Sequence, residues 1–241
     1  MTSDTTPTAA QPLTRVRVFD LETTGIDVET ARIVTAFIGD VVDDGKGGVT
    51  VDGDMDLLVN PGIEIPARAT EVHGITTEHA AAHGIDPGQA AVLLAASIAE
   101  AASQGIPMVV FNAPYDFTLL DRELRRNGHA PLNMNGVGVI DPLVIDKHVD
   151  KYRRGKRTLE VMTGHYGIRL DDAHTARADA VATGQLALLL MRHPLLLELD
   201  ADARMHLQAA AYREQMASLE AFKRRTEPAF ATPKDWPIRP A

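Results

Sequence analysis

The sequence predicts a mixed α/β fold in which helices cover both faces of a sheet. Its first part consists of apolar runs separated by turn signals, and its last part has the pattern of helices alone. Hydrophobic residues make up 45% of the chain and the mean hydropathy is -0.09, so a sizeable core can form without a stretch apolar enough to span a bilayer. We therefore expect a soluble domain with tails.

Three strands are expected to open the sheet. Residues 15–20 alternate charged and apolar side chains, which places Val16 and Val18 on one face of a strand. The apolar run 32–42 predicts a second strand, and residues 54–59 predict a third. Because a turn signal rich in aspartate and glycine follows the second run, we expect these strands to be antiparallel neighbours.

Two helices and two further strands follow. An alanine-rich helix is expected over 87–103, since its first residue is a proline, which is tolerated in the first turn. Residues 107–111 predict a short buried strand, and 116–126 predict an amphipathic helix that ends at an Asn-Gly pair. Residues 137–140 predict a fifth strand, which completes a mixed sheet.

The rest of the chain is predicted to be helical, with a proline-rich end. The expected helices cover residues 142–149, 158–166, 175–192 and 195–224. Residues 225–241 contain Pro228, Pro233, Pro237 and Pro240, so an extended tail is expected there.

Two acids near the end of the first strand are the strongest local signal. Asp20 and Glu22 are separated by one residue, so both carboxylates point to the same side of a strand. Like charges at this range repel and raise a pKa, and a bound cation removes that penalty. An exposed acidic strand end is the alternative interpretation.

Two further acids lie at predicted helices. Asp116 is expected in the first turn after a buried strand, although an acid there also simply favours the helix dipole. Asp179 falls among small residues, where a charged side chain needs a partner. His174 precedes it by five positions, so it must lie on the loop entering the helix if both serve one site. A helix-entry histidine and an exposed aspartate are the alternative.

These segments resemble, in order, the three motifs of the DEDDh or DnaQ-like 3′→5′ exonucleases, which include the epsilon proofreading subunit of bacterial DNA polymerase III, ribonuclease T and oligoribonuclease. The first motif is Asp-x-Glu, here Asp20 and Glu22, and the second carries an aspartate, here Asp116. The third is His-x-x-x-x-Asp, here His174 and Asp179.

The resemblance implies a ribonuclease H-like fold: a five-stranded mixed sheet flanked by helices, here with a helical C-terminal extension. The predicted organisation is a disordered tail over 1–14, an exonuclease domain over 15–193, a helix packed on the domain over 194–224 and the proline-rich tail over 225–241.

Resemblance and acids together imply a metal-dependent nuclease, a hydrolase that releases nucleoside 5′-monophosphates from single-stranded ends. With no cysteine in the chain, any metal must be held by Asp, Glu, His or backbone oxygen, and hard cations such as Mg²⁺ or Mn²⁺ are expected. Two cations roughly 4 Å apart would be held by the four carboxylates, and His174 would take the proton of the attacking water. The prediction favours DNA over RNA, although no motif here encodes contacts to a 2′-hydroxyl.

Contacts to the terminal nucleotide are predicted from the same resemblance. Thr23 and Thr24 would offer backbone or hydroxyl groups to the 3′ end, and Asn112 belongs to the second motif. His73 lies in a Val-His-Gly-Ile-Thr segment that is near the terminal nucleotide in relatives of the epsilon subunit; a packed helix-end histidine is the alternative. Many members have histidine where this chain has Phe111, which puts one nucleotide contact in doubt.

The charge distribution points to a second contact with nucleic acid. The net charge of -9 argues weakly against such a partner, but residues 147–157 hold six basic residues and one acid. Arg153 and Arg154 are therefore predicted to track phosphates, with Tyr152 available for base stacking. A solvated connecting loop is the alternative.

Other functions are tied to the C-terminal region. Residues 215–222 resemble clamp-binding peptides, so one alternative is a DNA replication or repair subunit bound to a polymerase or sliding clamp. Met216, Leu219 and Phe222 recur at helical spacing, however, which favours ordinary core packing. Trp236 would anchor the tail to the domain or to a partner.

Two more alternatives are an oligoribonuclease-like RNA exonuclease and a nucleic-acid-binding module without activity. The first residues lack the basic start and apolar middle of a secretory signal. The expected location is therefore the cytoplasm, with no membrane contact.

Overall fold

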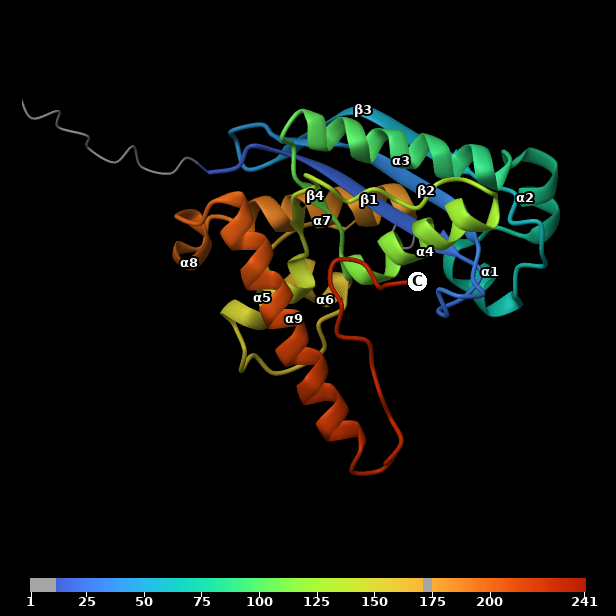
Figure 1. The fold of residues 1–241 in the computed structure, drawn as a ribbon. Helices are drawn as coiled ribbons and strands as arrows, with labels where there is room; N and C mark the ends of the chain where they lie inside the picture. Colours follow the sequence, from blue (N-terminus) through green and yellow to red (C-terminus); the bar gives the residue numbers. More distant parts are fainter. Residues whose placement is uncertain (1–11, 171–174) are drawn as a thin grey trace, which may run out of the picture.

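The computed structural model describes residues 12–170 and 175–241, and its centre is a five-stranded sheet with the order β3-β2-β1-β4-β5 (Figure 1). The strands are β1 (Arg15–Thr23), β2 (Ile33–Asp43), β3 (Val49–Leu58), β4 (Met108–Val109) and β5 (Val139–Ile140). β2 is antiparallel to β1 and β3, whereas β4 runs parallel to β1 and β5. The predicted five-stranded mixed sheet is confirmed.

Helices cover both faces of this sheet. In the described ranges they are α1 (Ala67–His73), α2 (Thr77–His83), α3 (Pro87–Ser103), α4 (Ala113–Arg126), α5 (Pro142–Val149), α6 (Leu159–His165), α7 (Ala176–Leu190), α8 (Pro194–Leu197) and α9 (Ala201–Lys223). α3 and α4 pack on one face, and α7 with α5 and α6 packs on the other. α9 lies against α5 and projects away from the sheet (Figure 1).

The alternation of β1 divides the core between the two faces. Phe19 belongs to the cluster under α3 and α4, while Val16 and Val18 belong to the cluster under α7. Because side chains two apart on a strand share a face, Asp20 and Glu22 lie on the α7 side of the sheet.

The prediction of one helix over 195–224 is wrong. α8 ends at Leu197, and a separate helix, α9, begins at Ala201. The side chain of Asp200 accepts a hydrogen bond from the backbone N–H of Ala203 at 2.7 Å, which caps the new helix. An uninterrupted apolar pattern does not reveal such a break.

Smaller differences concern boundaries and two short helices. β3 begins at Val49 instead of residue 54, and α4 begins at Ala113 instead of residue 116. α1 and α2 were not predicted, because α1 has no buried residue and α2 buries only Ala80. Without a buried face, neither helix has an apolar period.

The last 17 residues form no helix or strand, as predicted, but they pack back onto the domain. Trp236 and Ile238 lie against the core cluster under α3 and α4. The backbone N–H of Arg239 donates to Thr118 Oγ1 at 3.0 Å. Trp236 therefore anchors the tail to the domain, which was one of its two predicted roles.

Close packing of α7 on the sheet depends on Gly184. A Cβ atom at this position would lie 2.6 Å from Val18 Cγ1 and 3.0 Å from Val41 Cβ. We expect Gly184→Ala to lower the free energy of unfolding by about 2 kcal/mol, because the helix must move away from β1. Urea unfolding of the variant measures this loss.

Gly164 in α6 is the matched control, since no atom lies within 4 Å of a Cβ built there. Gly164→Ala is expected to stabilise the protein by roughly 0.5 kcal/mol, because alanine loses less backbone entropy in a helix. Equal effects of the two substitutions would contradict the close approach of α7.

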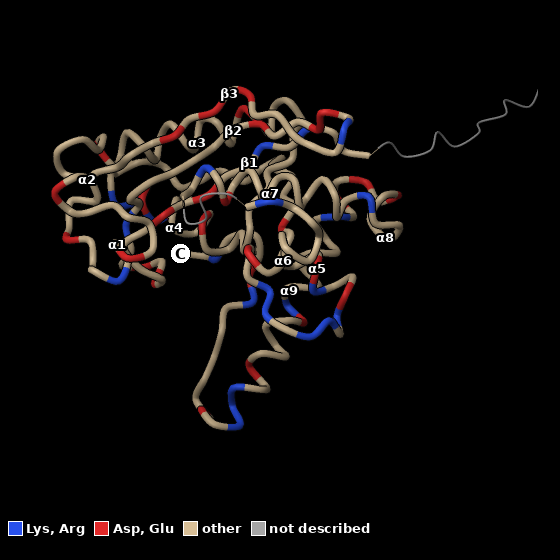
Figure 2. The backbone as a smooth tube through the Cα atoms, turned by 180° about the vertical axis from the view of Figure 1, so that it is seen from behind, with Lys and Arg blue, Asp and Glu red and all other residues tan. Residues whose placement is uncertain are grey.

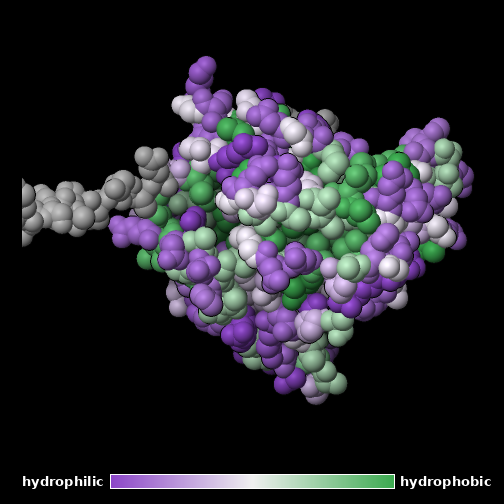
Figure 3. Space-filling view, turned by 45° about the horizontal axis from the view of Figure 1, so that its top comes forward, coloured by the Kyte–Doolittle hydropathy of each residue, from purple (hydrophilic) through white to green (hydrophobic). Residues whose placement is uncertain are grey.

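Hydrophilic and hydrophobic residues are interspersed over the face shown in Figure 3. Across residues 12–170 and 175–241, no helix combines the length and the hydropathy that crossing a bilayer requires.

Candidate active site

Two acids lie at the end of β1, beyond the region where a parallel strand accompanies it. Asp20 and Glu22 are partly buried and pair across to Phe37 and Thr35 of β2. On the other side, β1 pairs with β4 only as far as Val18. The last residues of β1 therefore have an edge that β4 does not cover, where other elements can approach.

Asp116 occupies that edge. It lies in the first turn of α4, as predicted, and only 4% of it is exposed. The backbone of Leu21 on β1 hydrogen-bonds to its carboxylate. β4 lies next to β1 in the sheet, and α4 follows β4 after a short turn. The strand order therefore places Asp116 near the end of β1.

Asp179 reaches the end of β1 from the face of the sheet that α7 covers, opposite the face that α3 and α4 cover. It lies partly buried in the first turn of α7, and its charge acts on both Asp20 and Glu22. α7 starts at Ala176 after its N-cap Thr175. His174, the predicted proton acceptor, lies outside the described residues.

These acids raise one another's pKa. Burial holds the pKa of Asp20 well above its ordinary value, and the charges of Asp116, Glu22 and Asp179 raise it further. Burial and the charge of Asp179 raise the pKa of Glu22 to about 7. Burial, together with the charges of Asp141 and Glu22, also raises the pKa of Asp116. Folding thus concentrates negative charge that a cation would stabilise.

The donor chemistry fits a divalent cation. In the described part of the chain, no lysine or arginine is among the groups that set the pKa of Asp20, Glu22 or Asp116. Carboxylate oxygens are the ligands that hard cations prefer. However, among residues 12–170 and 175–241, no three His, Asp or Glu side chains are close enough together to hold a metal ion as they stand. The assignment of individual ligands therefore stays a prediction.

Hydrogen bonds fix the loop that follows β1. Thr23 Oγ1 donates to the carbonyl oxygen of Gly25 at 2.8 Å, and Tyr115 Oη lies 2.5 Å from the same oxygen and 2.6 Å from Thr23 Oγ1. Thr24 Oγ1 accepts from the backbone N–H of Arg32 at 3.0 Å. Both threonine hydroxyls, which were predicted to contact the 3′ end, are engaged within the protein.

His73 and Asn112 border this loop and α4. Burial lowers the pKa of His73, whose ring lies near the backbone of Thr23. Its Nδ1 accepts from the N–H of Ile75 at 3.2 Å, and its buried Nε2 has no partner among the described residues. Asn112 is the N-cap of α4 and has a left-handed backbone, with φ 65° and ψ 51°. Their nucleotide contacts stay predictions.

The basic segment 147–157 divides into structural and exposed residues. Arg153 donates to the buried Asp146 at 2.5 Å, and Arg157 bonds to the same carboxylate. These two guanidinium groups hold the loop together. Arg154 is exposed, and basic positions gather around this loop and the far end of α9 (Figure 2). Any contact with phosphates therefore depends on Arg154 more than on Arg153.

The clamp-like segment 215–222 packs only in part. Gln215 Nε2 donates to the carbonyl of Val144 at 3.0 Å, and Met216 lies against a small core cluster. Leu219 is 39% exposed and Phe222 is 62% exposed. The interpretation as core packing is thus right for Met216 and wrong for the other two, because α9 extends beyond the domain (Figure 1).

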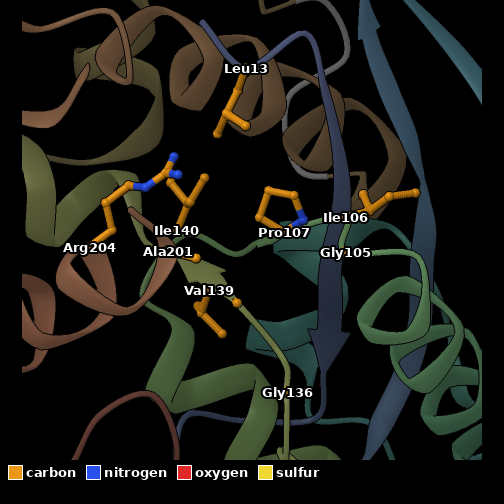
Figure 4. Close-up of a pocket in the computed structure, with 10 residues that line it drawn as sticks. Leu13, Gly105, Ile106, Pro107, Gly136, Val139, Ile140, Ala201 and Arg204 are labelled. Atoms are coloured by element: carbon orange, nitrogen blue, oxygen red, sulfur yellow. The ribbon is translucent and has the colours of Figure 1, made fainter. Parts of the chain in front are cut away.

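A cavity of about 150 Å³ lies at the opposite end of the parallel strands, where β4 and β5 begin (Figure 4). Its lining consists of Leu13, Gly105, Ile106, Pro107, Gly136, Gly138, Val139, Ile140, Ala201 and Arg204. This lining has no acid, so the cavity is not the site of the carboxylates.

Sequence reasoning missed Tyr115 and Asp141. Tyr115 precedes Asp116 and its hydroxyl reaches the loop after β1. Asp141 is fully buried and accepts hydrogen bonds from the turn before α4. An aspartate directly before a helix-opening proline signals an N-cap, but its long-range bonds have no sequence signal.

Fold and site together define a ribonuclease H-like α/β domain with an acidic site at the end of its central strand. The model of the exonuclease family RNase_T matches residues 18–187, and the chain belongs to this family. The predicted family membership is confirmed.

Two similar bacterial proteins are named after DNA polymerase III. A DNA polymerase III subunit epsilon-like protein of Rhodobacter capsulatus is 31% identical over 195 residues, covering 72% of this chain and 23% of the relative. A PolC-type DNA polymerase III of Streptococcus thermophilus is 26% identical over 176 residues, covering 73% of this chain and 11% of the relative. The chain thus spans less than a quarter of these relatives.

Solved structures share the fold. E. coli exonuclease I with a dT13 oligonucleotide has a TM-score of 0.61 at 20% identity, covering 77% of this chain and 42% of that one. The same enzyme with a dA16 oligonucleotide has a TM-score of 0.63 at 19% identity, covering 86% and 46%. The predicted ribonuclease H-like fold is confirmed.

Proposed function

We propose that the chain is a metal-dependent 3′→5′ exonuclease that removes nucleoside 5′-monophosphates from single-stranded DNA. The supporting observation is the group of four acids at the end of β1, where burial and neighbouring negative charges raise the pKa of Asp20 and of Glu22. Membership of the exonuclease family supports a catalytic role for these acids.

In this proposal, Asp20, Glu22, Asp116 and Asp179 would hold two divalent cations, Mg²⁺ or Mn²⁺. When bound, such cations lower the pKa of a water molecule and stabilise charge on the leaving oxygen. His174 accepts the proton as the water oxygen attacks the terminal phosphorus. The bond between phosphorus and the 3′-oxygen breaks, which leaves a 5′-monophosphate and a strand with a new 3′-hydroxyl.

DNA is the proposed substrate because the structurally similar exonuclease I was solved with DNA oligonucleotides. The exposed Arg154 and Tyr152 next to α5 would contact the phosphates and bases of the incoming strand. Since Arg153 is held by Asp146, it would support this surface rather than bind a phosphate itself.

A second candidate is a proofreading or repair subunit within a polymerase assembly. The names of the replicative relatives and the exposure of Leu219 and Phe222 on α9 support it. An exposed apolar pair on a projecting helix is a common docking feature for a partner protein.

Digestion of 5′-labelled single-stranded DNA, duplex DNA and a two-nucleotide RNA tests the proposal. With Mg²⁺ or Mn²⁺ we expect single-stranded DNA to shorten one nucleotide at a time from the 3′ end, and chelator to stop the reaction. Release of no mononucleotide with either cation would refute the activity. Cleavage of the RNA dinucleotide alone would favour an oligoribonuclease-like enzyme instead.

A further inference from the structure

Asp141, the residue before α5, receives more hydrogen bonds than a helix cap requires. It is fully buried, and its carboxylate accepts from the backbone N–H groups of Leu143 at 3.1 Å and Val144 at 3.3 Å, as expected for an N-cap. The same carboxylate also accepts from the N–H groups of Asn112 at 3.1 Å and Ala113 at 3.0 Å. These two bonds join it to the turn that carries α4.

That turn has an unusual backbone. Among the described residues, Asn112 is the only non-glycine residue with a positive φ, a conformation disfavoured for residues that carry a Cβ atom. Parallel pairing of β4 with β5 continues as Val110 N–H bonds to the carbonyl of Ile140, which brings Asp141 beside Asn112. Asp116 follows four residues later, so the geometry of this turn sets the start of the helix that carries it.

The C-terminal tail packs over Asp141. Trp236 packs between the core clusters, and its Nε1 lies 3.4 Å from Asp141 Oδ2, at the long end of hydrogen-bond distance. Further along, Arg122 on α4 donates to the carbonyl of Pro240 at 2.7 Å. The tail therefore runs from α9 back to α4 (Figure 1), and Asp141 is the group that both the tail and the turn contact.

We propose that Asp141 is a positioning residue for Asp116, because it holds the left-handed turn at Asn112 and Ala113. Trp236 covers the Asp141 carboxylate and excludes water from it. This inference rests on the proposed function, because positioning matters for catalysis only if Asp116 serves the cation site. Buried groups that orient a metal-binding carboxylate commonly contribute about 10- to 100-fold to affinity or activity.

Asp141→Asn tests the proposal, since the amide keeps the shape but turns a donor toward an N–H group. We expect kcat to fall at least about tenfold with KM changed much less, because substrate contacts remain. We also expect the amide hydrogens of Asn112 and Ala113 to exchange faster, a readout that does not depend on activity. The inference is overturned if both kcat and exchange stay at wild-type values.

Asp121→Asn is the matched control. Asp121 is also buried, at 3% exposure, belongs to α4 and accepts from the backbone N–H of Leu132 at 3.0 Å, but it lies in the second half of the helix. The Asp121→Asn variant should have a lower melting temperature, with kcat and the exchange of the Asn112 amide hydrogen unchanged. If Asp121→Asn and Asp141→Asn reduced kcat equally, the role of Asp141 would be stability alone.

Trp236→Phe provides a variant that keeps the packing if Asp141→Asn folds poorly. Its loss of the indole N–H should reduce kcat by about threefold and speed exchange at Asn112, whereas unchanged exchange would remove the tail from the proposal. A wild-type protein that degrades no substrate would refute the proposed exonuclease activity. The exchange experiment would still decide whether Asp141 holds the turn.

Discussion

Asp20→Asn is expected to abolish 3′→5′ hydrolysis, with a loss of at least about 1000-fold, while leaving the metal-free protein folded. Cations supply several kcal/mol of transition-state stabilisation, and each 1.36 kcal/mol corresponds to tenfold in rate. Burial raises the pKa of Asp20 most, and the charges of all three other acids, Asp116, Glu22 and Asp179, raise it further. Its carboxylate is therefore the centre of the charged group.

The thermal stability of the same variant separates a functional acid from a structural one. Removing one of several repelling charges should leave the melting temperature of the metal-free protein unchanged or higher. Mononucleotide release and thermal unfolding, measured on the same preparations, test both parts. A variant that unfolds more easily and keeps its rate per folded molecule would contradict the assignment.

Two comparisons make this experiment specific. Asp52→Asn removes an exposed acid on β3, away from the end of β1, and should leave activity intact. His174→Ala should slow hydrolysis strongly but leave the affinity for cations nearly unchanged, because it is proposed to move a proton rather than to bind metal.

The stability of the metal-free protein is expected to fall as the pH rises from 4.5 towards 8. Glu22 has an ordinary pKa of 4.5 and a pKa of about 7 in the folded protein. A group whose pKa is raised by folding binds its proton more tightly when folded. Its contribution is therefore complete below 4.5 and is lost as the pH rises through about 7. Discounted for the partial exposure of Glu22, this amounts to roughly 2 kcal/mol.

Divalent cations should reverse this loss. Deprotonated acids bind cations, so Mn²⁺ at about 100 times its Kd should add about 2.7 kcal/mol at pH 8 and much less at pH 5. Thermal unfolding between pH 5 and pH 8, with and without Mn²⁺, provides the measurement. An equal effect of Mn²⁺ at both pH values would argue against binding by these acids.

Glu22→Gln isolates the contribution of Glu22 from opposing groups. The pKa of His73 is lowered by burial, so this histidine contributes stability that is lost as the pH falls below 6.5. The difference between wild type and Glu22→Gln cancels such terms. A pH dependence that survives in Glu22→Gln undiminished would assign it to other residues.

Periodicity predicted those elements that bury a face. α3 and α5 have the predicted bounds, and the alternation in β1 placed Val16, Val18, Asp20 and Glu22 on one side. Periodicity failed to predict elements and breaks whose residues show no alternation between buried and exposed positions. α1 has no buried residue, and the break before α9 depends on the single cap at Asp200.

The grouping of the acids at the end of β1 was predictable from local spacing and family motifs, but the residues that support it were not. Asp116 comes to β1 because β4 pairs with it, and the motif marks the residue without showing this route. Asp141 follows β5, bonds to the turn after β4 and lies beside Trp236, 95 residues later in the chain. No local pattern in the sequence encodes these contacts. In the same way, Arg153 has the composition of a phosphate contact, yet the buried Asp146 engages it.

Calorimetric titration of Mn²⁺ into wild-type and Asp20→Asn protein at pH 8 tests the central claim most directly. The acids at the end of β1 should give saturable binding in the wild type and at least about tenfold weaker binding in the variant. Equal affinity in both proteins would contradict a cation site at these acids, whatever the enzyme does with nucleic acid.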